Sequence, residues 1–331
     1  MLTGARTHDV VNQARPLEGF NRYQHDDALR DAVGRNGAGW DEVELLRIGE
    51  LTGTAAFIKL GELANHYEPE LKAFDRFGHR INEVHYHDAY HQLMTISVRE
   101  GLAGMPWSDE RPGSWVSRLA RCYMVTQVEQ GHGCPVTMTF ASIPALRWQA
   151  DIYEQWAPKV TSRHYDGRNV PASQKKGVTV GMAMTEKQGG SDVRANSTRA
   201  VRDGDGWRLT GHKWFCSAPM CDLFLTLAQT DEGLTCFLVP RWTPDGARNA
   251  MNIQRLKSKI GNRSNASSEI EYAGAWAQQV GELGRGIRTI IDMVAHTRLD
   301  CVTGSSSVMR AALSQAVWHT RHRSAFGKRL I

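Results

Sequence analysis

The sequence lacks the features of membrane, secreted or disulfide-stabilised proteins. No run approaches the roughly 18 consecutive apolar residues of a membrane-spanning helix, and residues 1–9 lack the basic and apolar segments of a signal peptide. None of the six cysteines forms a Cys-x-x-Cys pair, so we expect free thiols. We therefore predict a cytoplasmic globular protein that does not bind a membrane.

A complete set of metal ligands is also missing. The 13 histidines include His87 and His91, which would share one face of a helix close to His85. No cluster of cysteines or carboxylates completes a site around them. We therefore predict no bound metal.

Charge is distributed unevenly along the chain. The net charge is +5, from 40 basic and 35 acidic residues, and residues 285–331 alone carry eight basic and two acidic residues. A basic stretch can contact the phosphates of nucleic acid, of a nucleotide cofactor or of coenzyme A. A solvated helix face is the commoner explanation of such a stretch.

The first half of the chain is predicted to be helical. Residues 1–36 show no periodicity and indicate an extended arm, after which Asp41 and Glu44 have the spacing of a capping box. Apolar residues then recur at helical intervals to about Ala64. Further helices are expected near residues 87–100, 114–130 and 144–156, with joints at 104–106 and 131–135. Residues 37–177 would therefore form a helical domain that ends in a polar linker.

Short strands are predicted for residues 178–280. Asp203-Gly204-Asp205-Gly206 and Asp231-Glu232-Gly233 each lie between two runs of strand character and indicate hairpin turns. Residues 281–331 then show a helical stripe without proline from position 287 onwards. At 331 residues, which suggests roughly two domains, the sequence predicts an α+β multidomain protein. Its middle part would be an antiparallel β-barrel or sandwich, and long helices would follow.

One stretch, residues 182–195, combines a strand with a glycine turn. Val180, Met182 and Met184 alternate with other residues, as in a half-buried strand. Gly189 and Gly190 then allow a sharp bend and close approach to a ligand, with N–H groups and the Ser191 hydroxyl available for a phosphate or a heterocycle. An ordinary glycine turn at the end of a strand is the simpler alternative.

A second stretch, residues 211–218, places aromatic and small polar residues together. The ring of Phe215 could stack on a planar cofactor, and the hydroxyl of Ser217 could hydrogen-bond one of its ring atoms. A core aromatic pair beside a capping serine is equally compatible with this pattern.

Together, the two stretches resemble the acyl-CoA dehydrogenase family of flavoproteins. The first signature of that family fits at every constrained position, namely Ala183-Met184-Thr185-Glu186, Gly189-Gly190-Ser191-Asp192 and Ala195. Within the family, the sequence is most similar to the AidB-type alkylation-response flavoproteins, through residues 185–192, 211–215 and 259–267. The resemblance runs from about residue 37 to the end of the chain.

This resemblance implies the cofactor FAD, an acyl-CoA substrate and a homo-oligomer, a tetramer in the family. Residues expected to bind FAD are Met182, Met184, Thr185, Gly190, Ser191, Phe215, Cys216, Ser217 and Arg323. By resemblance, Met184 and Thr185 meet the pyrimidine edge and Ser191 the pyrophosphate. Phe215 lies against the isoalloxazine, with Ser217 near N5. Arg323 would reach the FAD of a neighbouring subunit.

The sequence departs from the family pattern at three places. Ala218 stands where many members have asparagine, and Ala295, three residues before Arg298, replaces an aspartate found near the CoA tail of straight-chain enzymes. The family's catalytic glutamate belongs to later helices of a C-terminal bundle, beyond Ile331, so no catalytic residue is assigned. We expect Glu186 to have a structural role in its turn.

Three functions remain open from the sequence. The first is an AidB-type flavoprotein of the DNA alkylation response, with weak dehydrogenation of isovaleryl-CoA. It would contact double-stranded DNA mainly through regions beyond this chain. The second is an ordinary acyl-CoA dehydrogenase of short branched substrates. The third is a truncated, inactive chain that serves as a binding or structural fragment.

Overall fold

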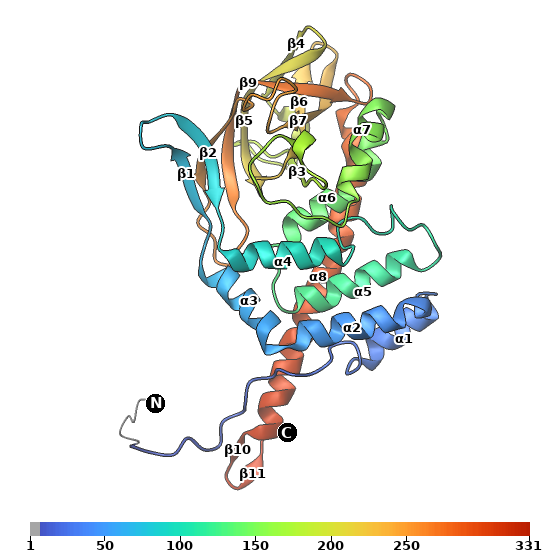
Figure 1. The fold of residues 1–331 in the computed structure, drawn as a ribbon, viewed down its shortest axis with the longest axis vertical. Helices are drawn as coiled ribbons and strands as arrows, with labels where there is room; N and C mark the ends of the chain where they lie inside the picture. Colours follow the sequence, from blue (N-terminus) through green and yellow to red (C-terminus); the bar gives the residue numbers. More distant parts are fainter. Residues whose placement is uncertain (1–6) are drawn as a thin grey trace.

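The computed structural model describes residues 7–331, so residues 1–6 of the expected arm lie outside the described part of the chain. Figure 1 shows a layered helical part, a β-sheet part at one end of the molecule, and one long helix that runs past both. The expected three-part α+β architecture is confirmed. Within the described residues, no helix combines the length and the apolar character needed to cross a membrane.

The helical part contains seven α-helices and one hairpin among the described residues. The helices are α1 (Asp27–Arg35), α2 (Glu42–Gly53), α3 (Ala55–His66), α4 (Asp88–Arg99), α5 (Ser114–Thr126), α6 (Gly133–Leu146) and α7 (Ala150–Val160). The hairpin consists of β1 (Glu70–Phe74) and β2 (Arg80–His85) and projects to one side of the sheet in Figure 1. Short 3-10 turns lie at Gly39–Asp41, Ala172–Gln174 and Val193–Ala195.

Several local predictions were wrong in this part. The expected extended arm contains α1, whose N-cap Asp26 accepts a hydrogen bond from the N–H of Leu29 at 3.1 Å. The single helix predicted to end near Ala64 is broken at Thr54, which ends α2 and caps α3 by accepting the N–H of Phe57. The β1–β2 hairpin was not predicted, and Asp75 holds its turn by accepting two backbone N–H groups.

The expected joint and helix around residues 131–156 were also misplaced. Helix α6 already begins at Gly133, and a break at residues 147–149 separates it from α7. Pro135 is compatible with this start because a proline in the first turn of a helix has no N–H that would need an intrahelical partner. The glycine and proline therefore begin a helix here instead of separating two.

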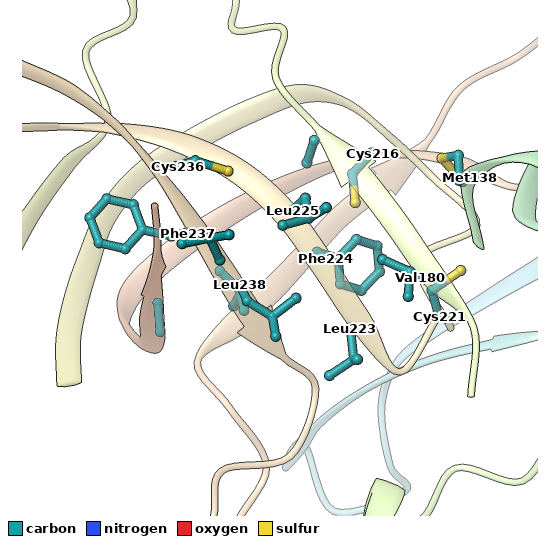
Figure 2. Packing of buried hydrophobic residues seen from close by; sticks show 14 of the residues in the cluster. Met138, Val180, Cys216, Cys221, Leu223, Phe224, Leu225, Cys236, Phe237 and Leu238 are labelled. Carbon is teal, nitrogen blue, oxygen red and sulfur yellow. The ribbon is translucent and has the colours of Figure 1, made fainter. Parts of the chain in front are cut away.

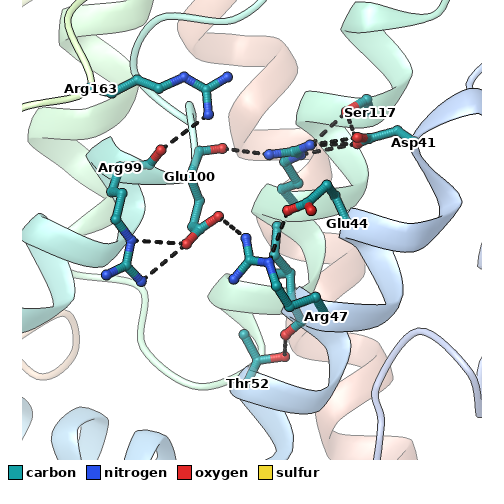
Figure 3. Close-up of polar contacts among 10 residues, drawn as sticks. Asp41, Glu44, Arg47, Thr52, Arg99, Glu100, Ser117 and Arg163 are labelled. Atoms are coloured by element: carbon teal, nitrogen blue, oxygen red, sulfur yellow. Dashed lines mark hydrogen bonds and ion pairs between the residues drawn. The ribbon is translucent and has the colours of Figure 1, made fainter.

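The predicted capping box at Asp41 does not form. Asp41 stands at the N-cap of α2, but its side chain makes no capping hydrogen bond. It instead accepts from the Ser117 hydroxyl at 2.5 Å and from the Arg121 guanidinium at 2.6 Å, in the buried network of Figure 3. Glu44, the other expected partner, binds Arg47 at 2.9 Å. A buried ion pair between helices has therefore taken the place of a local cap.

The sheet part is a small barrel with two extra strands. Its strands are β3 (Val180–Ala183), β4 (Arg199–Asp203), β5 (Gly206–Ser217), β6 (Leu223–Thr230), β7 (Gly233–Pro240), β8 (Met251–Leu256) and β9 (Ser267–Val280). The ring closes in the order β6-β4-β5-β9-β7 and back to β6, while β3 joins β6 and β8 joins β9. Both predicted hairpins, β4–β5 and β6–β7, are confirmed. The strands are not all antiparallel, since β3 runs parallel to β6.

The interior of the barrel holds the main hydrophobic core. Figure 2 shows Phe224 and Leu225 of β6 beside Phe237 and Leu238 of β7, all fully buried. Cys216 and Cys236 fill gaps between these larger side chains, and the structure leaves both as free thiols. Because both faces of β6 and β7 are covered, these strands read as continuous apolar runs.

Helix α8 (Gly286–His322) is one continuous helix of 37 residues, where the sequence suggested more than one. It packs along α5, α6 and β7, and its His296 stacks on Trp107 with ring centroids 5.4 Å apart. A two-residue hairpin, β10 (Ser324–Ala325) and β11 (Lys328–Arg329), follows at its far end. Figure 1 places this end of the molecule opposite the barrel.

Candidate functional site

The two stretches singled out in the sequence meet through a buried ion pair. The ammonium of Lys213, in β5, donates to the Glu186 carboxylate at 2.9 Å, and both side chains are completely buried. Lys213 also donates to the carbonyl of Leu227 at 2.8 Å. Glu186 in addition accepts the backbone N–H groups of Ser197 at 2.6 Å and Thr198 at 3.1 Å. The predicted structural role of Glu186 therefore agrees with its contacts.

These contacts set the ionisation of the pair. Burial alone would raise the pKa of Glu186, but hydrogen bonding from Thr198, the charge of Lys213 and the Ser197 N–H together lower it to about 2. Burial lowers the pKa of Lys213, and the Glu186 charge opposes that shift. The Glu186 carboxylate is therefore charged at neutral pH, and its hydrogen bond with Lys213 fixes the glycine turn against β5.

The strand before the turn presents its last residues to the site. Met182 lies in β3, and Met184 and Thr185 follow it, all three only partly buried. The carbonyl of Met184 accepts from the Asn196 side chain at 3.0 Å, and the carbonyl of Thr185 accepts the N–H of Trp214 at 2.7 Å. The backbone after β3 is thus held on both sides, next to β5.

The glycine turn leaves a surface for a ligand. Gly189 has φ +125°, which side-chain-bearing residues rarely adopt. A Cβ added to Gly190 would lie 2.4 Å from the Thr185 hydroxyl oxygen, so only glycine fits there without moving Thr185. Gly190 and Ser191 are both exposed. The turn can therefore offer backbone N–H groups and a hydroxyl to an anion.

A β-bulge presents the aromatic part of the site. Along β5 the pairing with β9 shifts between Lys213 and Cys216, so one extra residue is accommodated there. Phe215, within this bulge, is 47% exposed, while the next residue, Cys216, is fully buried. Ser217 ends the strand, with its hydroxyl 3.4 Å from that of Ser267. The bulge thus aims one aromatic ring outward beside a hydroxyl group.

Two features of this site were missed in the sequence. The ammonium of Lys257 lies 3.2 Å from the ring centroid of Trp214 and 4.6 Å from that of Phe215, while it also pairs with Glu269 at 2.7 Å. Cys134 lies at the start of α6, where burial raises the pKa of its thiol and the nearby Ser217 hydroxyl opposes that rise. Lys257 lies two positions before the shared stretch at residues 259–267, which was the available signal, whereas nothing local marked Cys134.

Asn265 adds a polar group with no protein partner. Asn265 is only 5% exposed, and its Oδ1 atom accepts no hydrogen bond from the described residues. It also approaches Cys134 and thereby the Ser217 end of β5. A buried acceptor without a donor is costly, so this place fits a ligand that carries a donor.

A groove of about 400 Å³ lies next to this place, between α5, α6 and α8. Cys134 lies on its wall and also reaches Ser217, so the groove adjoins the Ser217 end of β5. Part of its wall is aliphatic or carries thiols, including Leu102, Cys122 and Val125, and polar residues such as Thr126 and His132 line the rest. The groove can therefore hold an apolar group beside a ring that stacks on Phe215.

A buried hydrogen-bond network joins the segment before α6 to α4 and to the loop that contains Ser264. Glu129 accepts from the His132 ring at 2.6 Å and from the Ser264 hydroxyl at 2.7 Å, and His132 in turn contacts the Ser97 hydroxyl at 2.9 Å. Burial alone would raise the pKa of Glu129, but its hydrogen bonds and charge interaction with His132 and the hydrogen bond from Ser264 lower it to about 2. The loop that carries Asn265 is thus tied to the helix that carries Cys134.

Arg323 is not part of this assembly within one chain. It follows the last residue of α8, and its guanidinium donates to the carbonyl of Asn12 at 2.8 Å. The barrel lies at the opposite end of the molecule in Figure 1. The predicted cofactor residues within residues 182–195 and 211–218 therefore lie near one another, whereas Arg323 lies far from them.

The residues present fit a planar ring system with an anionic tail. The exposed ring of Phe215 supplies a stacking face, Ser217 supplies a hydroxyl group, and Asn265 supplies the buried acceptor. The Gly189–Gly190 turn would receive the anionic tail. Cys216 can take part only through its backbone, because its side chain points into the barrel core of Figure 2.

Comparison with family models gives two matches along the chain. Residues 12–167 match the N-terminal domain of the adaptive response protein AidB. Residues 181–275 match the middle domain of acyl-CoA dehydrogenases.

Individual relatives agree with these matches. The AidB protein of Escherichia coli strain K12, whose name assigns it to the acyl-CoA dehydrogenases, is 48% identical over 98% of this chain and 61% of its own length. The crystal structure of Caenorhabditis elegans ACDH-11 in complex with C11-CoA superposes with a TM-score of 0.87, at 26% identity, over 100% of this chain and 59% of that one. Butyryl-CoA dehydrogenase from Megasphaera elsdenii shares the fold, with a TM-score of 0.65 at 16% identity, over 92% of this chain and 72% of that one. The chain spans less than two thirds of the length of the first two relatives.

Proposed function

Because the chain belongs to the acyl-CoA dehydrogenase family and carries an AidB-type N-terminal domain, we propose that it is an FAD-binding flavoprotein that takes an acyl-CoA thioester. Members of this family are FAD-dependent flavoproteins. The observation that carries the proposal is the junction of the two stretches through Glu186 and Lys213. It ties the glycine turn to β5, the strand that carries Phe215 and Ser217.

Each part of FAD has residues of this chain to hold it. The backbone after β3, at Met184 and Thr185, would bind the pyrimidine edge, and Met182 would border it. The turn at Gly190 and Ser191 would receive the pyrophosphate. Phe215 would stack against the isoalloxazine, with Ser217 as a hydrogen-bond donor beside it. When bound, FAD supplies the hydride acceptor for α,β-dehydrogenation of an acyl thioester.

The groove between α5, α6 and α8 is proposed as the acyl site. The apolar part of its wall would exclude water from the acyl group and hold it beside the stacked ring. Asp300 is the only carboxylate on the described wall, and a bidentate contact with Arg118 at 2.7 Å occupies it. Both of its oxygens already accept hydrogen bonds from Arg118, and one also accepts from the Thr137 hydroxyl, so we assign no catalytic base within this chain.

We further propose that the protein acts as a homo-oligomer. Arg323 lies too far along α8 to serve the site of its own chain, as Figure 1 illustrates. A guanidinium at the end of a long rigid helix is suited to reach a phosphate held by another subunit. Val302, Met309 and Leu313 of α8 are more than half exposed, which also favours a helical partner along this face.

An association with the DNA alkylation response is proposed from the AidB-type N-terminal domain. The basic residues after position 284 are partly engaged in this structure, since Arg310 pairs with Asp26 at 3.1 Å and Arg323 binds Asn12. Others, such as Arg298 and Arg321, are exposed and can meet phosphates, whereas the guanidinium of Arg329 donates to the carbonyl of Arg321. Band retardation with duplex DNA at rising salt tests this, because loss of binding at modest salt would leave only unspecific phosphate attraction.

The enzymatic part is tested by anaerobic addition of isovaleryl-CoA to the FAD-loaded chain. Loss of the flavin absorption near its visible maximum would support dehydrogenation of a short branched thioester. A loaded flavin that stays oxidised with isovaleryl-CoA and with straight-chain thioesters would contradict the dehydrogenase activity. It would favour a role in binding alone.

A further inference from the structure

A buried ion pair lies on the wall of the groove proposed as the acyl site. Arg118 of α5 donates to both carboxylate oxygens of Asp300 of α8 at 2.7 Å, and its Nε donates to the carbonyl of Leu102 at 2.7 Å. The Arg118 guanidinium also lies 3.4 Å from the ring centroid of Phe140. Arg118 is fully buried, so its guanidinium interacts with these protein partners and not with solvent.

Asp300 is the member of this pair that faces the groove. Its side chain is 10% exposed, against 0% for Arg118, and it lies on the groove wall. Its Oδ2 accepts from both Arg118 and the Thr137 hydroxyl, whereas its Oδ1 accepts only from Arg118 within the described residues. A carboxylate oxygen can accept two hydrogen bonds, so Oδ1 keeps one free acceptor position.

Apolar side chains line part of the groove that Asp300 faces. Cys122, Val125 and Val308 line the same groove, and burial raises the pKa of the Cys122 thiol to about 12, so it stays neutral. An aliphatic group that fills the groove would displace water from Asp300 and leave Oδ1 with an unmet acceptor. A group that carries a hydroxyl would replace that water with its own O–H.

From this geometry we propose that the groove selects acyl groups that carry a hydroxyl a few carbons from the thioester, which rests on the proposed acyl-CoA function. Thr137, which binds Asp300, lies one helical turn after Cys134, and Cys134 marks the Ser217 end of the groove. The hydroxyl therefore belongs near the fourth carbon. A carboxylate at that carbon is disfavoured, because Asp300 presents the negative member of the pair.

Three thioesters of matched length test this selection on the wild-type chain loaded with FAD. We expect 4-hydroxybutyryl-CoA to bind roughly tenfold more tightly than butyryl-CoA, as measured by isothermal titration calorimetry. Succinyl-CoA should bind more weakly than butyryl-CoA. Equal dissociation constants for the hydroxylated and plain thioesters would overturn the inference while leaving the proposed function intact. Failure of all three to bind would overturn both.

A paired substitution assigns the effect to these residues. Arg118→Met combined with Asp300→Leu removes both charges and leaves neither buried alone. The hydroxyl preference should then fall to within about twofold, with circular dichroism used to verify the fold. Thr303→Ala, at another position of the same wall, should keep the preference. A double variant that folds and still prefers the hydroxylated thioester would contradict the assignment to Asp300.

Discussion

The ammonium of Lys213 lies 2.9 Å from the carboxylate of Glu186, and neither side chain has any exposed surface. This contact joins the turn after β3 to the middle of β5. The residues proposed to hold the two ends of the flavin therefore move as one unit. This contact also supports the prediction that Glu186 has a structural role in its turn.

Removal of one partner of this pair should be costly. Glu186→Gln leaves the Lys213 charge buried without its counter-ion, so we expect the free energy of unfolding to fall by about 3 kcal/mol or more. Urea denaturation followed by circular dichroism measures this. Glu62→Gln is the matched control, because Glu62 and Lys59 form an exposed pair at 3.0 Å, expected to contribute less than about 0.5 kcal/mol. Similar losses in the two variants would contradict this reading of Glu186.

Stability should decline in acid because of two buried carboxylates. The pKa values of Glu186 and Glu129 are each about 2 in the folded chain, below the ordinary value for glutamate of about 4.3. Their contribution is fully present above that ordinary value and is lost as pH falls toward 2, by up to about 3 kcal/mol for each group.

Urea midpoints measured between pH 6 and pH 3 check this linkage. The wild-type midpoint should fall steeply below about pH 4.5, and Glu129→Gln should start lower at pH 6 and fall less. A wild-type midpoint that stays constant to pH 3 would show that these carboxylates are not stabilised in the folded chain.

Gly190→Ala should disturb the flavin site more than the fold. The new Cβ would lie 2.4 Å from the Thr185 hydroxyl oxygen, so Thr185 must move away from the pyrimidine edge it is proposed to bind. We expect FAD to dissociate at least roughly tenfold more readily, as followed by flavin fluorescence. Gly34→Ala, where a Cβ meets nothing within 4 Å, is the control. Unchanged FAD affinity in the Gly190 variant would argue against this turn as part of the site.

Arg323→Ala should weaken FAD binding only through contact between chains. A lost charge-assisted hydrogen bond predicts roughly tenfold weaker retention of FAD. The control is Asn12→Ala, which removes the side-chain contacts of Asn12 with Ser324 at 2.7 and 2.8 Å in the same region. Flavin content after gel filtration at several dilutions distinguishes the two variants, because only Arg323→Ala is expected to lose FAD. If the Arg323 variant retains as much flavin as the wild type, the proposed contact with a neighbouring subunit's FAD is contradicted. Arg323 would then serve only as a contact with Asn12 at the end of the helix.

Local chemistry explains which parts of the fold could be predicted. The turns at Gly204 and Glu232 are specified by residues within a few positions, and both hairpins form there. The capping box at Asp41 failed because Arg121, distant in sequence, competes for the same carboxylate. The missed β1–β2 hairpin had a local signal in Asp75 and Gly78, which form its turn.

The candidate site divides in the same way. The glycine turn and the Phe215–Ser217 segment were visible because each has a short sequence pattern. Cys134 and Lys257 reach the site only because α6 and the segment after β8 pack against the end of β5. Such contacts depend on tertiary packing, and no spacing in the sequence encodes them.

The most direct test is the visible absorption spectrum of the purified chain after incubation with FAD and removal of free cofactor. The account predicts about one FAD per binding site, with a flavin spectrum shifted by stacking on Phe215 and hydrogen bonding to Ser217. Phe215→Ala should lose most of the bound cofactor. A colourless wild-type chain, or equal retention of FAD by the Phe215 variant, would contradict the proposed flavin site.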